Sequence, residues 1–323
     1  MVKSAALYHP VQDDLRLVDE MLDTLKQDVD FPPLVAMMDM VITGSGKRLR
    51  PALALLAGTF GEYRLDLLVP LAASVELLHT ATLVHDDVID GATTRRGHTT
   101  VNAMFHNSTT VMLGDYMFAN AADLVARTGN IRVIRLFSHT LLVMAKGEIG
   151  QDMSAYDSRQ GVQDYLHRIA GKTASLFATA CEGGAIIGGE PEEHIQALRD
   201  YGYNLGMAFQ IVDDILDFTG DETEMGKPVG SDLWQGTLTL PSLILMDRYP
   251  QDNPVTKLFG NRRRREHLDQ AVTMVRESDI PGESFAMARS FCDKAREAIS
   301  ILPERPALET LLNLTDYILE RSS

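Results

Sequence analysis

The sequence predicts an all-α fold, a single domain over residues 1–323 in which ten or more helices surround a central cavity. Apolar residues recur at three- and four-residue steps along most of the chain, the spacing of amphipathic helices. These stretches are rich in Ala, Leu and Met, which favour helices. The alternating pattern of paired strands and the Asn-Gly hairpin signal are both missing, so we expect no β-sheet.

The helical periodicity is clear in six segments. These are Leu65–His85, Val111–Ala126, Val133–Ala145, Gln163–Ile187, Glu192–Thr219 and Ser284–Ile301. Glycines at positions 58, 129, 188, 189 and 220 mark where helices are expected to end. Thr219–Gly236 is polar, Gly-rich and contains Pro228, which predicts a lid loop. We expect a second loop over Pro250–Asn261.

Composition narrows the class of protein. The 45% of hydrophobic residues is enough for a sizeable core. Thirty Lys and Arg residues against 45 Asp and Glu give a net charge of −15. Nucleic acids require a basic footprint and anionic membranes attract basic surfaces, so this charge argues against both as permanent partners. The composition does not shift along the chain, which favours one domain.

The cysteines and the longest apolar stretch predict the compartment. Cys181 and Cys292 are too few for a disulfide scaffold, and two buried, reduced thiols suit a cytoplasmic protein. The first twenty residues mix acidic and basic side chains without the apolar core of a signal peptide. Glu76 and His79 interrupt the stretch Leu67–Val84, which favours a buried helix over a membrane-spanning one.

Two carboxylate clusters carry the strongest chemical signal. They are Asp86-Asp87-Val88-Ile89-Asp90 and Asp213-Asp214-Ile215-Leu216-Asp217. On a helix, residues four apart share a face, so the first and last aspartates of each cluster lie one turn apart. Like charges at this spacing repel each other, and within apolar helices a cation would offset the cost. Oxygen ligands alone favour Mg²⁺.

Each cluster has an alternative interpretation. A DDxxD pattern also occurs on a solvated acidic helix face and at helix caps, but two copies embedded in apolar sequence favour a metal site. A calcium loop of the EF-hand type is excluded because its ligand loop and glycine are missing. The spacing of 127 residues between the copies is consistent with a duplication or with two helices that converge on one site.

Basic residues near these clusters are suited to bind diphosphate. Lys47 and Arg50 lie three residues apart in a Gly-flexed turn whose spacing does not match a P-loop. They suit a diphosphate clamp, although an exposed basic turn is the alternative. Arg95 and Arg96 follow the first cluster by five residues. Adjacent side chains point in different directions, so this pair could serve two phosphate groups.

Other polar residues are less specific. Lys172 lies in an apolar helical stretch, where a lysine usually extends its amine to solvent. Lys227 lies in the expected lid, and Arg262–Arg265 is expected to be a solvated charge run in a loop. A lone histidine such as His79 is often structural. The sequence around it has no zinc ligand set and no Ser-His-Asp arrangement.

Taken in order, these motifs resemble the trans-prenyltransferase family, the polyprenyl diphosphate synthases, from about residue 30 to the C-terminus. One motif alone is weak, whereas the ordered series is specific. The series is Gly46-Lys47-Arg48-Leu49-Arg50-Pro51, Glu76-Leu77-Leu78-His79, Asp86–Asp90 with Arg95-Arg96-Gly97, Gly147-Glu148 with Gln151, Gly171-Lys172-Thr173, Phe209-Gln210 before Asp213–Asp217, Gly226-Lys227-Pro228 and Asp232–Pro241.

The resemblance implies an isoprenoid synthase fold and a magnesium-dependent, head-to-tail condensation of isopentenyl diphosphate with an allylic diphosphate. Three Mg²⁺ ions are implied, two on Asp86 and Asp90 and a third on Asp213, with support from Asp87, Asp214 and Asp217. The implied allylic diphosphate ligands are Arg95, Lys172, Thr173, Gln210 and Lys227. The implied isopentenyl diphosphate ligands are Lys47, Arg50, His79 and Arg96. The catalytic set is then Asp86, Asp90, Asp213 and Lys172.

The same resemblance implies how the reaction runs. The allylic diphosphate leaves, the isopentenyl double bond attacks the allylic cation, and a proton is lost to the released diphosphate. A closed lid keeps water from the cation. The chain departs from the family pattern at Thr237, where a lysine often stands in Gly-Lys-x-Thr-x-Pro. The missing cation predicts weaker binding of the allylic diphosphate.

Small residues on the helix of the first cluster predict a long product. In the family, bulky aromatics four or five positions before the first aspartate stop elongation early. Here these positions are Thr82 and Ala81, and Leu78, one turn deeper, is a moderate obstacle. We therefore expect a product longer than C20. Met112, Met117 and Met144 could line a soft apolar tunnel, or belong to the ordinary core.

Other functions stay possible at this point. They are a geranylgeranyl or farnesyl diphosphate synthase with a shorter product, a class I terpene cyclase, and a regulatory subunit of a hetero-oligomeric synthase. The second aspartate cluster argues against the cyclase, and regulatory subunits generally lose the aspartates. The resemblance implies a homodimer, for which Val111–Ala126 is a candidate interface. A cytoplasmic location is expected, with transient membrane association for release of a long product.

Overall fold

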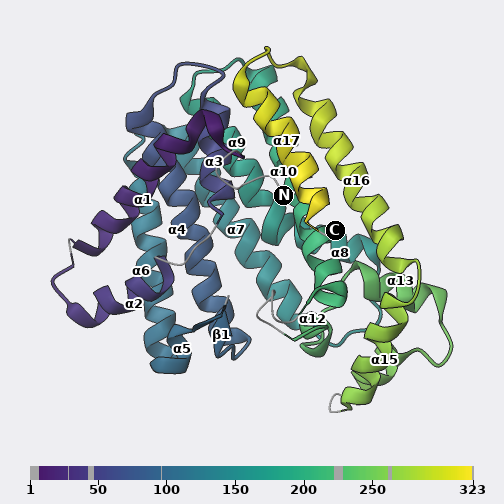
Figure 1. The fold of residues 1–323 in the computed structure, drawn as a ribbon. Coiled ribbons are helices and arrows are strands. Elements are labelled where there is room, and N and C mark those ends of the chain that lie inside the picture. Colours follow the sequence, from purple (N-terminus) through teal and green to yellow (C-terminus); the bar gives the residue numbers. More distant parts are fainter. Residues whose placement is uncertain are drawn as a thin grey trace. The chain divides into compact units, whose positions relative to one another are not determined.

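The computed structural model describes residues 7–27, 29–42, 47–95, 97–221, 228–260 and 264–321, and its architecture is helical (Figure 1). The chain forms two compact units. The first unit comprises Met1–Thr140, Leu176–Gly202 and Ala298–Leu314. The second comprises Leu141–Ser175, Tyr203–Glu297 and Thr315–Ser323. The expectation of a single domain over residues 1–323 stays a prediction.

The first unit contains the N-terminal helices and parts of helices shared along the chain. Its elements are η2 (His9–Val11), α1 (Gln12–Gln27), α2 (Pro32–Ile42), α3 (Leu49–Gly58), α4 (Leu65–Ile89), α5 (Val101–Met104), α6 (Asn107–Ala126), the first turns of α7 (Ile131–Met153), α9 (Ser175–Ile187), the start of α10 (Glu192–Thr219), η4 (Ile299–Ile301) and most of α17 (Pro306–Glu320). The short strands β1 (Thr94–Arg95) and β2 (His98–Thr99) also belong to it.

The second unit contains the remaining parts of α7, α10 and α17 together with a run of shorter helices. These are α8 (Val162–Ile169), the π-helical turn η3 (Ala170–Ala174), α12 (Ser231–Trp234), α13 (Leu240–Arg248), α14 (Pro254–Gly260), α15 (Arg265–Arg276) and α16 (Ile280–Ala298). The prediction of an all-α protein with ten or more helices is confirmed.

Helix α4 forms the core of the first unit. It is apolar on nearly all sides, which is the pattern of a buried helix, and it packs against α1, α3 and α6. By length and composition α4 could cross a membrane, but 72% of its most apolar window is buried, as in the core helix of a soluble protein. The predicted helix is thus confirmed and extends to Ile89, so that the first acidic cluster occupies its last turns.

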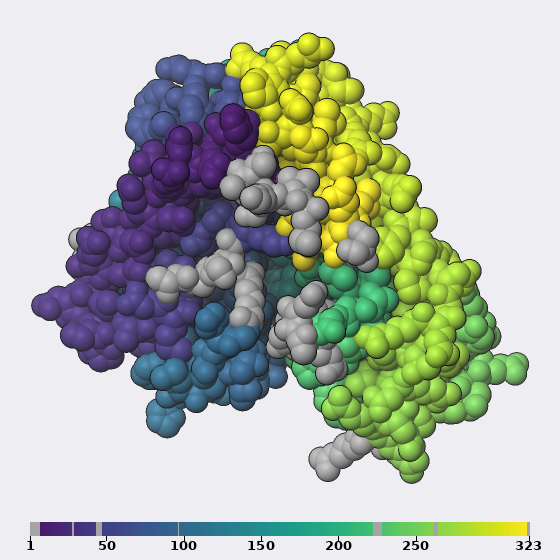
Figure 2. Space-filling model, viewed as in Figure 1, coloured from purple at the N-terminus to yellow at the C-terminus, as the bar shows by residue number. Residues whose placement is uncertain are grey.

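Helix α1 shows how the amphipathic pattern places the outer helices. Its buried residues Leu15, Val18, Leu22 and Leu25 recur at three- and four-residue steps and form a single apolar stripe. The opposite face is polar and lies at the surface, where α1 is seen in purple in Figure 2. Its buried stripe packs on α4.

Most of the predicted helices are confirmed with shifted ends. Helix α10 matches its predicted bounds, whereas α7 begins two residues earlier and ends eight residues later than predicted. The predicted helix over Gln163–Ile187 is interrupted by the π turn η3. The cysteines Cys181 and Cys292 are buried as free thiols, as expected.

Three expectations about non-helical segments were wrong. The chain does form a β-hairpin, in which Thr94 pairs with Thr99 and Arg95 with His98, and Gly97 in its turn has φ +79°. Strands of two residues are too short to show an alternating pattern. The predicted second loop contains α14, which begins after Asn253, whose Oδ1 accepts a hydrogen bond from the Val255 amide at 2.9 Å. This helix-capping contact was missed.

The third concerns the basic run Arg262–Arg265. Arg265 is the first residue of α15 and not part of a loop, and Arg264 is its N-cap. Arg262 and Arg263 lie outside the described residues. In the predicted lid, the structure describes α12 at the C-terminal end, after Gly230 with φ +71°.

Candidate active site

The first acidic set lies on the last turns of α4 in the first unit. Asp86 is half-buried, Asp87 is buried and Asp90, the C-cap of the helix, is exposed. The Asp90 amide donates to the Asp86 carbonyl at 2.8 Å, which keeps the helical spacing between the two residues. Their carboxylates are therefore one turn apart on the more accessible side of the helix end.

The buried Asp87 carboxylate forms a partly exposed ion pair with a residue of the hairpin. The Arg95 Nε donates to Asp87 Oδ1 at 2.6 Å. Burial raises the pKa of Asp87 above its ordinary value, and the pairing with Arg95 only partly opposes this effect. A buried carboxylate with a charged partner is positioned firmly, because loss of the partner would leave its charge uncompensated.

Two polar residues fix the backbone after the first acidic set, and sequence reasoning missed both. The Asn102 side chain of α5 donates to the carbonyls of Asp87 at 3.1 Å and Ala92 at 2.9 Å. The Thr100 hydroxyl donates to the same Ala92 carbonyl at 2.7 Å. Neither residue belongs to a recognisable motif, because its partner depends on how the hairpin folds back.

His85, directly before the set, packs against α6. Its Nε2 lies 2.9 Å from the Val111 carbonyl, and its ring meets the edge of Phe118 with centroids 5.3 Å apart. A Cβ atom on Gly114 would lie 2.1 Å from His85 Nε2, so this close approach requires glycine. A glycine in the interior of the α6 sequence was the available signal for this contact.

The second acidic set lies on α10 in the second unit, and its first member is the most accessible. Asp213 is exposed, and Arg321 near the end of the chain donates to its Oδ1 at 2.8 Å. The same guanidinium lies over the Phe209 ring, 4.6 Å from the centroid, a cation–π arrangement. Arg321 was missed because it lies 108 residues away in the sequence.

Asp214 is buried at the centre of a hydrogen-bond network. Gln210 Nε2 donates to its Oδ1 at 2.8 Å, and the Tyr165 hydroxyl donates to its Oδ2 at 2.7 Å. Burial raises the pKa of Asp214 to about 8, and the nearby Asp232 adds to the shift. Each carboxylate oxygen of Asp214 thus has a donor from the protein itself.

Asp217 holds the chain that follows the expected lid. Its side chain is fully buried, and it accepts hydrogen bonds from the Ser231 hydroxyl at 2.9 Å and from the Asp232 amide at 3.3 Å. The Gly230 amide donates to the Asp217 carbonyl at 2.8 Å. Asp217 therefore fixes the start of α12 against α10.

The predicted allylic residues of the second unit lie together. The Thr173 hydroxyl donates to Gln210 Oε1 at 2.6 Å, which links it through Gln210 to Asp214. The Lys172 Nζ lies 2.9 Å from the Glu148 carboxylate and stays partly exposed. Both residues lie in the π turn. Lys227 lies outside the described residues, and Arg95 belongs to the first unit.

The predicted isopentenyl residues lie in the first unit. Lys47 is exposed before α3, whereas Arg50 in its first turn is half-buried with its guanidinium 4.7 Å from the centroid of the Phe177 ring. His79 is half-buried on α4. Arg96 lies outside the described residues. Between Lys47 and Arg50, the Arg48 side chain bonds to Glu76 of α4 at 2.7 Å.

A sequence model of the polyprenyl synthetase family matches residues 32–275. The chain belongs to this family. It is 36% identical over 320 residues to heptaprenyl diphosphate synthase component 2 of Bacillus subtilis, a match that covers 99% of this chain and 91% of that protein. The family resemblance drawn from the motifs is confirmed, and membership makes the chain a prenyltransferase. The terpene cyclase alternative is set aside.

Solved structures of family members have the same fold. A decaprenyl diphosphate synthase from Rhodobacter capsulatus superposes with a TM-score of 0.92 at 35% identity, covering 99% of this chain and 100% of that one. A polyprenyl synthase from Caulobacter crescentus, solved with calcium and isoprenyl diphosphate, superposes with a TM-score of 0.93 at 33% identity, covering 99% and 98%. The predicted isoprenoid synthase fold is confirmed.

Family membership implies a divalent metal, and the aspartates fit one. Within the described ranges, no three carboxylates, imidazoles or thiols gather closely enough to form a cage around an ion. Mg²⁺ does not require such a cage, because it keeps several waters and typically binds one or two carboxylates and substrate phosphates. Asp86, Asp90 and Asp213 offer accessible oxygens for this kind of binding. Asp87, Asp214 and Asp217 are buried and accept hydrogen bonds from protein groups, and the exposed Asp213 also accepts one from Arg321.

The predicted chain-length residues lie on α4. Ala81 and Leu78 are completely buried. Thr82 is half-buried, and its hydroxyl donates to the His79 carbonyl of its own helix at 2.7 Å. Among the methionines proposed for a tunnel, Met112 is 68% exposed on α6, so its expected place in a buried lining was wrong.

The segment around Thr237 is supported by an arginine that sequence reasoning missed. The Thr237 amide donates to the Asp232 carbonyl at 2.9 Å. Arg168 of α8 donates to the adjacent Leu238 carbonyl and, at 3.0 Å, to the Gln160 side chain. Burial lowers the pKa of Arg168, although the neighbouring Asp214 and Asp232 oppose this shift.

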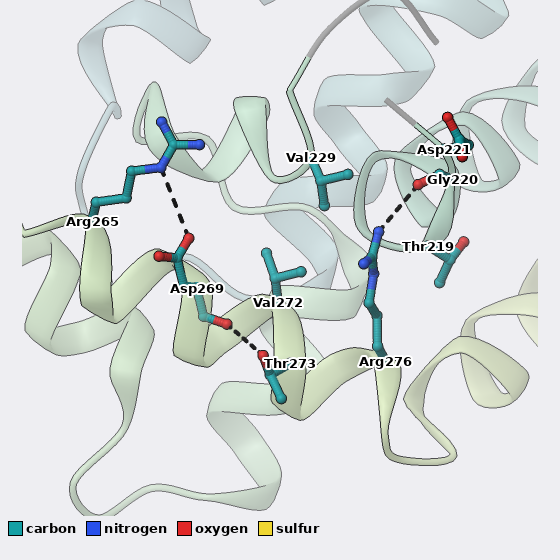
Figure 3. A pocket seen from close by; sticks show the side chains of 9 residues that line it. All are labelled: Thr219, Gly220, Asp221, Val229, Arg265, Asp269, Val272, Thr273 and Arg276. Carbon is teal, nitrogen blue, oxygen red and sulfur yellow. Dashed lines mark hydrogen bonds and ion pairs between the residues drawn. The ribbon is translucent and has the colours of Figure 1, made fainter. Parts of the chain in front are cut away.

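A polar pocket of about 760 Å³ lies where α10 ends beside α15 (Figure 3). Arg276 of α15 donates to the carbonyls of Phe218 at 2.5 Å and Gly220 at 3.1 Å. These bonds satisfy terminal carbonyls of α10, a favourable place for a cation. Among the predicted site residues that the structure describes, none lines the pocket. The contacts of Arg276 at this pocket support the end of α10, the helix that carries the second acidic set.

Proposed function

We propose that this prenyltransferase is a magnesium-dependent trans-polyprenyl diphosphate synthase that condenses isopentenyl diphosphate head to tail with an allylic diphosphate. The observation that carries the proposal is the hydrogen-bonded chain from Thr173 through Gln210 to Asp214, with bonds of 2.6 and 2.8 Å. It joins a phosphate-binding segment next to Lys172 with the helix that carries the second acidic set. A structural ion-pair cluster would not need a lysine and a threonine in a π turn beside it.

The proposed metal ligands are the accessible aspartates Asp86, Asp90 and Asp213, for three Mg²⁺ ions. When bound, Mg²⁺ supplies positive charge that stabilises the departing diphosphate. Asp87, Asp214 and Asp217 keep Arg95, Gln210 and the start of α12 in place through the hydrogen bonds described above.

The cationic side chains divide between the two substrates. Arg95, Lys172 and Lys227, with Thr173 and Gln210, bind the allylic diphosphate and stabilise it as the allylic C–O bond breaks. Lys47, Arg50, His79 and Arg96 orient isopentenyl diphosphate so that its double bond attacks the allylic cation. The new C–C bond forms from that electron pair, and the released diphosphate takes up the proton that is lost.

We propose a product longer than C20. The support comes from the complete burial of small Ala81 on α4 and from the relatives, which are named heptaprenyl and decaprenyl diphosphate synthases. The test is incubation with labelled isopentenyl diphosphate, Mg²⁺ and each of the C5 to C20 allylic primers, followed by sizing of the products. Products of C15 or C20 alone would contradict the length and leave the activity standing, whereas a wild-type chain that stays inert even with a partner protein would contradict both.

The Ala81→Phe variant should shorten the product without abolishing turnover, because the larger ring would occupy the space that the growing chain enters. Ala81 is completely buried, so the melting temperature of the variant must be measured alongside. Thr82→Phe is the matched second variant, since Thr82 is half-buried and accepts a larger side chain with less strain. An unchanged product in two folded variants would refute the assignment.

A second candidate is a catalytic subunit that requires a partner. The Bacillus subtilis relative is named component 2 of a heptaprenyl diphosphate synthase. The homodimer that we propose would use α6, which exposes 39% of Val111 and 68% of Met112. Light scattering on the purified chain, together with its activity alone, decides between the candidates. A homodimer active alone supports the first, and an inactive chain rescued by a second protein supports the other.

We also propose a cytoplasmic location with transient membrane association, because a long prenyl product is too apolar to leave into water. Product release that accelerates with added phospholipid vesicles would support this part of the proposal. Release at the same rate with and without vesicles would contradict it.

A further inference from the structure

Arg48 adopts an unusual backbone conformation directly before α3. Its φ of +47° and ψ of +32° place it in the left-handed region, which L residues other than glycine seldom adopt. Among the described residues, the other non-glycine residues with positive φ are Tyr156 and Asp252. Such strain persists only where the surrounding structure holds the residue firmly, and it often occurs at functional sites.

The Arg48 guanidinium is held on all sides. Its Nε donates to Asp19 Oδ1 at 2.8 Å, its Nη1 to Glu76 Oε1 at 2.7 Å and its Nη2 to the Ile42 carbonyl at 3.2 Å. The side chain of Arg48 is 18% exposed and that of Glu76 only 8%. In such a buried pair, loss of one partner leaves an uncompensated charge, so the geometry is firmly specified.

These contacts connect two segments that carry predicted ligands of isopentenyl diphosphate. Arg48 lies between Lys47 and Arg50, and its carbonyl accepts the Ala52 amide at 3.0 Å in the first turn of α3. Glu76 lies on α4, three residues before His79, so the two share one helix face. One side chain therefore fixes Lys47 and the start of α3, which carries Arg50, against the helix that carries His79.

We propose that Arg48, through Glu76, is a positioning residue for isopentenyl diphosphate. Its guanidinium is occupied by Asp19, Glu76 and Ile42, so it acts on Lys47, Arg50 and His79 and not on the substrate. The planar fork of arginine is required because a lysine cannot bond to three acceptors in different directions with the same geometry. This inference rests on the proposed function, which assigns isopentenyl diphosphate to those three residues.

A purely structural ion pair would have a different signature. Loss of a purely structural ion pair would lower the melting temperature and the fraction of active enzyme, and the kinetics with both substrates would change alike. A positioning role raises the KM for isopentenyl diphosphate and leaves the KM for the allylic substrate unchanged. The split between the two KM values therefore separates the roles.

Three variants test the contact. Arg48→Gly accepts the left-handed backbone but removes the guanidinium, Arg48→Lys keeps the charge without the fork, and Glu76→Gln keeps the shape of the partner without its charge. Each should raise the KM for isopentenyl diphosphate about tenfold or more, the size of effects seen for residues that support a ligand indirectly, while the allylic KM stays within about twofold. The double variant Arg48→Gly/Glu76→Gln should be no worse than the poorer single variant, because both changes break one contact.

Arg132→Gln is the matched control in the same unit. Arg132 donates to both carboxylate oxygens of Glu192 at 2.7 Å, and it is not part of the predicted site. Its loss removes an arginine–glutamate ion pair that is more exposed than that of Arg48, and both KM values should stay at the wild-type level. A comparable rise of the isopentenyl KM in this control would overturn the proposal.

The outcomes are distinct. Wild-type KM values in folded Arg48 and Glu76 variants, or equal changes for the two substrates, would overturn the inference. If Arg48→Gly fails to fold, the isosteric Glu76→Gln variant decides. If the wild-type chain forms no prenyl product, the proposed function has failed instead. Calorimetric binding of isopentenyl diphosphate to wild type and Glu76→Gln then tests the inference by itself, and equal affinities would overturn it.

Discussion

The two acidic sets have the same DDxxD spacing but different surroundings. The first occupies the end of α4, where Asp86 is half-buried, Asp90 is exposed and only Asp87 is buried in an ion pair. The second lies within α10, where Asp214 and Asp217 are both buried and bonded to protein donors. Its one exposed member, Asp213, is paired with Arg321.

This difference shows that one sequence pattern can serve two structural tasks. A carboxylate at an exposed helix end can bind a cation with less rearrangement than one buried among protein donors. A buried carboxylate with two donors organises its neighbours instead, and breaking its hydrogen bonds is costly. Under the proposed function the first set is mainly a binding element, whereas Asp214 and Asp217 of the second set are bonded to Gln210, Tyr165 and the start of α12.

The largest expected effect separates the sets directly. Asp86→Asn and Asp90→Asn should each reduce kcat about 10³-fold, because the lost transition-state charge stabilisation amounts to several kcal/mol. Asp214→Asn should cost about 10- to 100-fold at most, since an amide can still bond to Gln210 and Tyr165. Steady-state kinetics at saturating Mg²⁺ measures the difference. Equal losses of kcat in Asp86→Asn and Asp214→Asn would contradict the different roles of the two acidic sets.

The next effect concerns the tyrosine that supports the second set. Tyr165→Phe removes the 2.7 Å hydrogen bond to Asp214 and should reduce kcat/KM for the allylic substrate about tenfold, as expected for a supporting residue. The cause is a looser Asp214, which no longer fixes Gln210 and, through it, Thr173. The measurement is kcat/KM for each substrate separately.

Tyr201→Phe is the matched control for Tyr165→Phe. Tyr201 is equally buried, and its hydroxyl donates at the same distance of 2.7 Å to a carbonyl, that of Leu311. We expect a similar fall in melting temperature in the two variants but wild-type kinetics for Tyr201→Phe. If both variants lose the same activity, Tyr165 has no specific role.

The pH dependence of stability sharpens the comparison further. The folded-state pKa of Asp214 is raised from 3.8 to about 8, so the folded protein holds a proton that the unfolded chain releases. This contribution is full at low pH and is lost as pH rises toward 8. Wild type should lose stability between pH 4 and 8 more steeply than Asp214→Asn, by up to about 1.4 kcal/mol per pH unit. Metal-free denaturant titrations measure both slopes, and parallel curves would contradict the raised pKa.

The smallest expected effect is a gain in affinity for the allylic diphosphate. Thr237→Lys restores the cation that many family members have at this position and should lower the KM for the allylic diphosphate by a few fold, since an exposed charge pair contributes at most about 1 kcal/mol. Thr237→Gln, of similar length without the charge, should leave the KM unchanged. An unaltered KM in the lysine variant would mean that Arg168, beside Leu238, already supplies the needed charge.

The helices and the ordered motifs could be predicted from the sequence, because both are local signals. The three-to-four-residue periodicity located α4 and α10, and the aspartates at their known positions carried the family resemblance. Arg321, Tyr165, Arg168 and Asn102 were not foreseen. Each works through a partner 15 to 108 residues away, and neither spacing nor residue type reveals such a pairing.

The same limit explains the errors in local structure. The hairpin beside Arg95 is too short to leave an alternating pattern, and α14 is so short that its proline and polar neighbours resembled a loop. The hydrogen-bond partners of the second acidic set were also beyond the sequence. The resemblance assigned Asp213 to a metal ion and Asp214 and Asp217 to its support, but it could not name the groups to which Asp214 and Asp217 are hydrogen-bonded, because these come from other parts of the chain.

The π turn η3 has an evolutionary consequence. A π turn accommodates one residue more than a regular helix over the same length, so Ala170–Ala174 has the form of a single-residue insertion between α8 and α9. The extra residue shifts Lys172 and Thr173 out of the regular helical order. A one-residue deletion here would leave a well-formed continuous helix, and a homologue carrying it could retain the fold while abandoning the chemistry of this family.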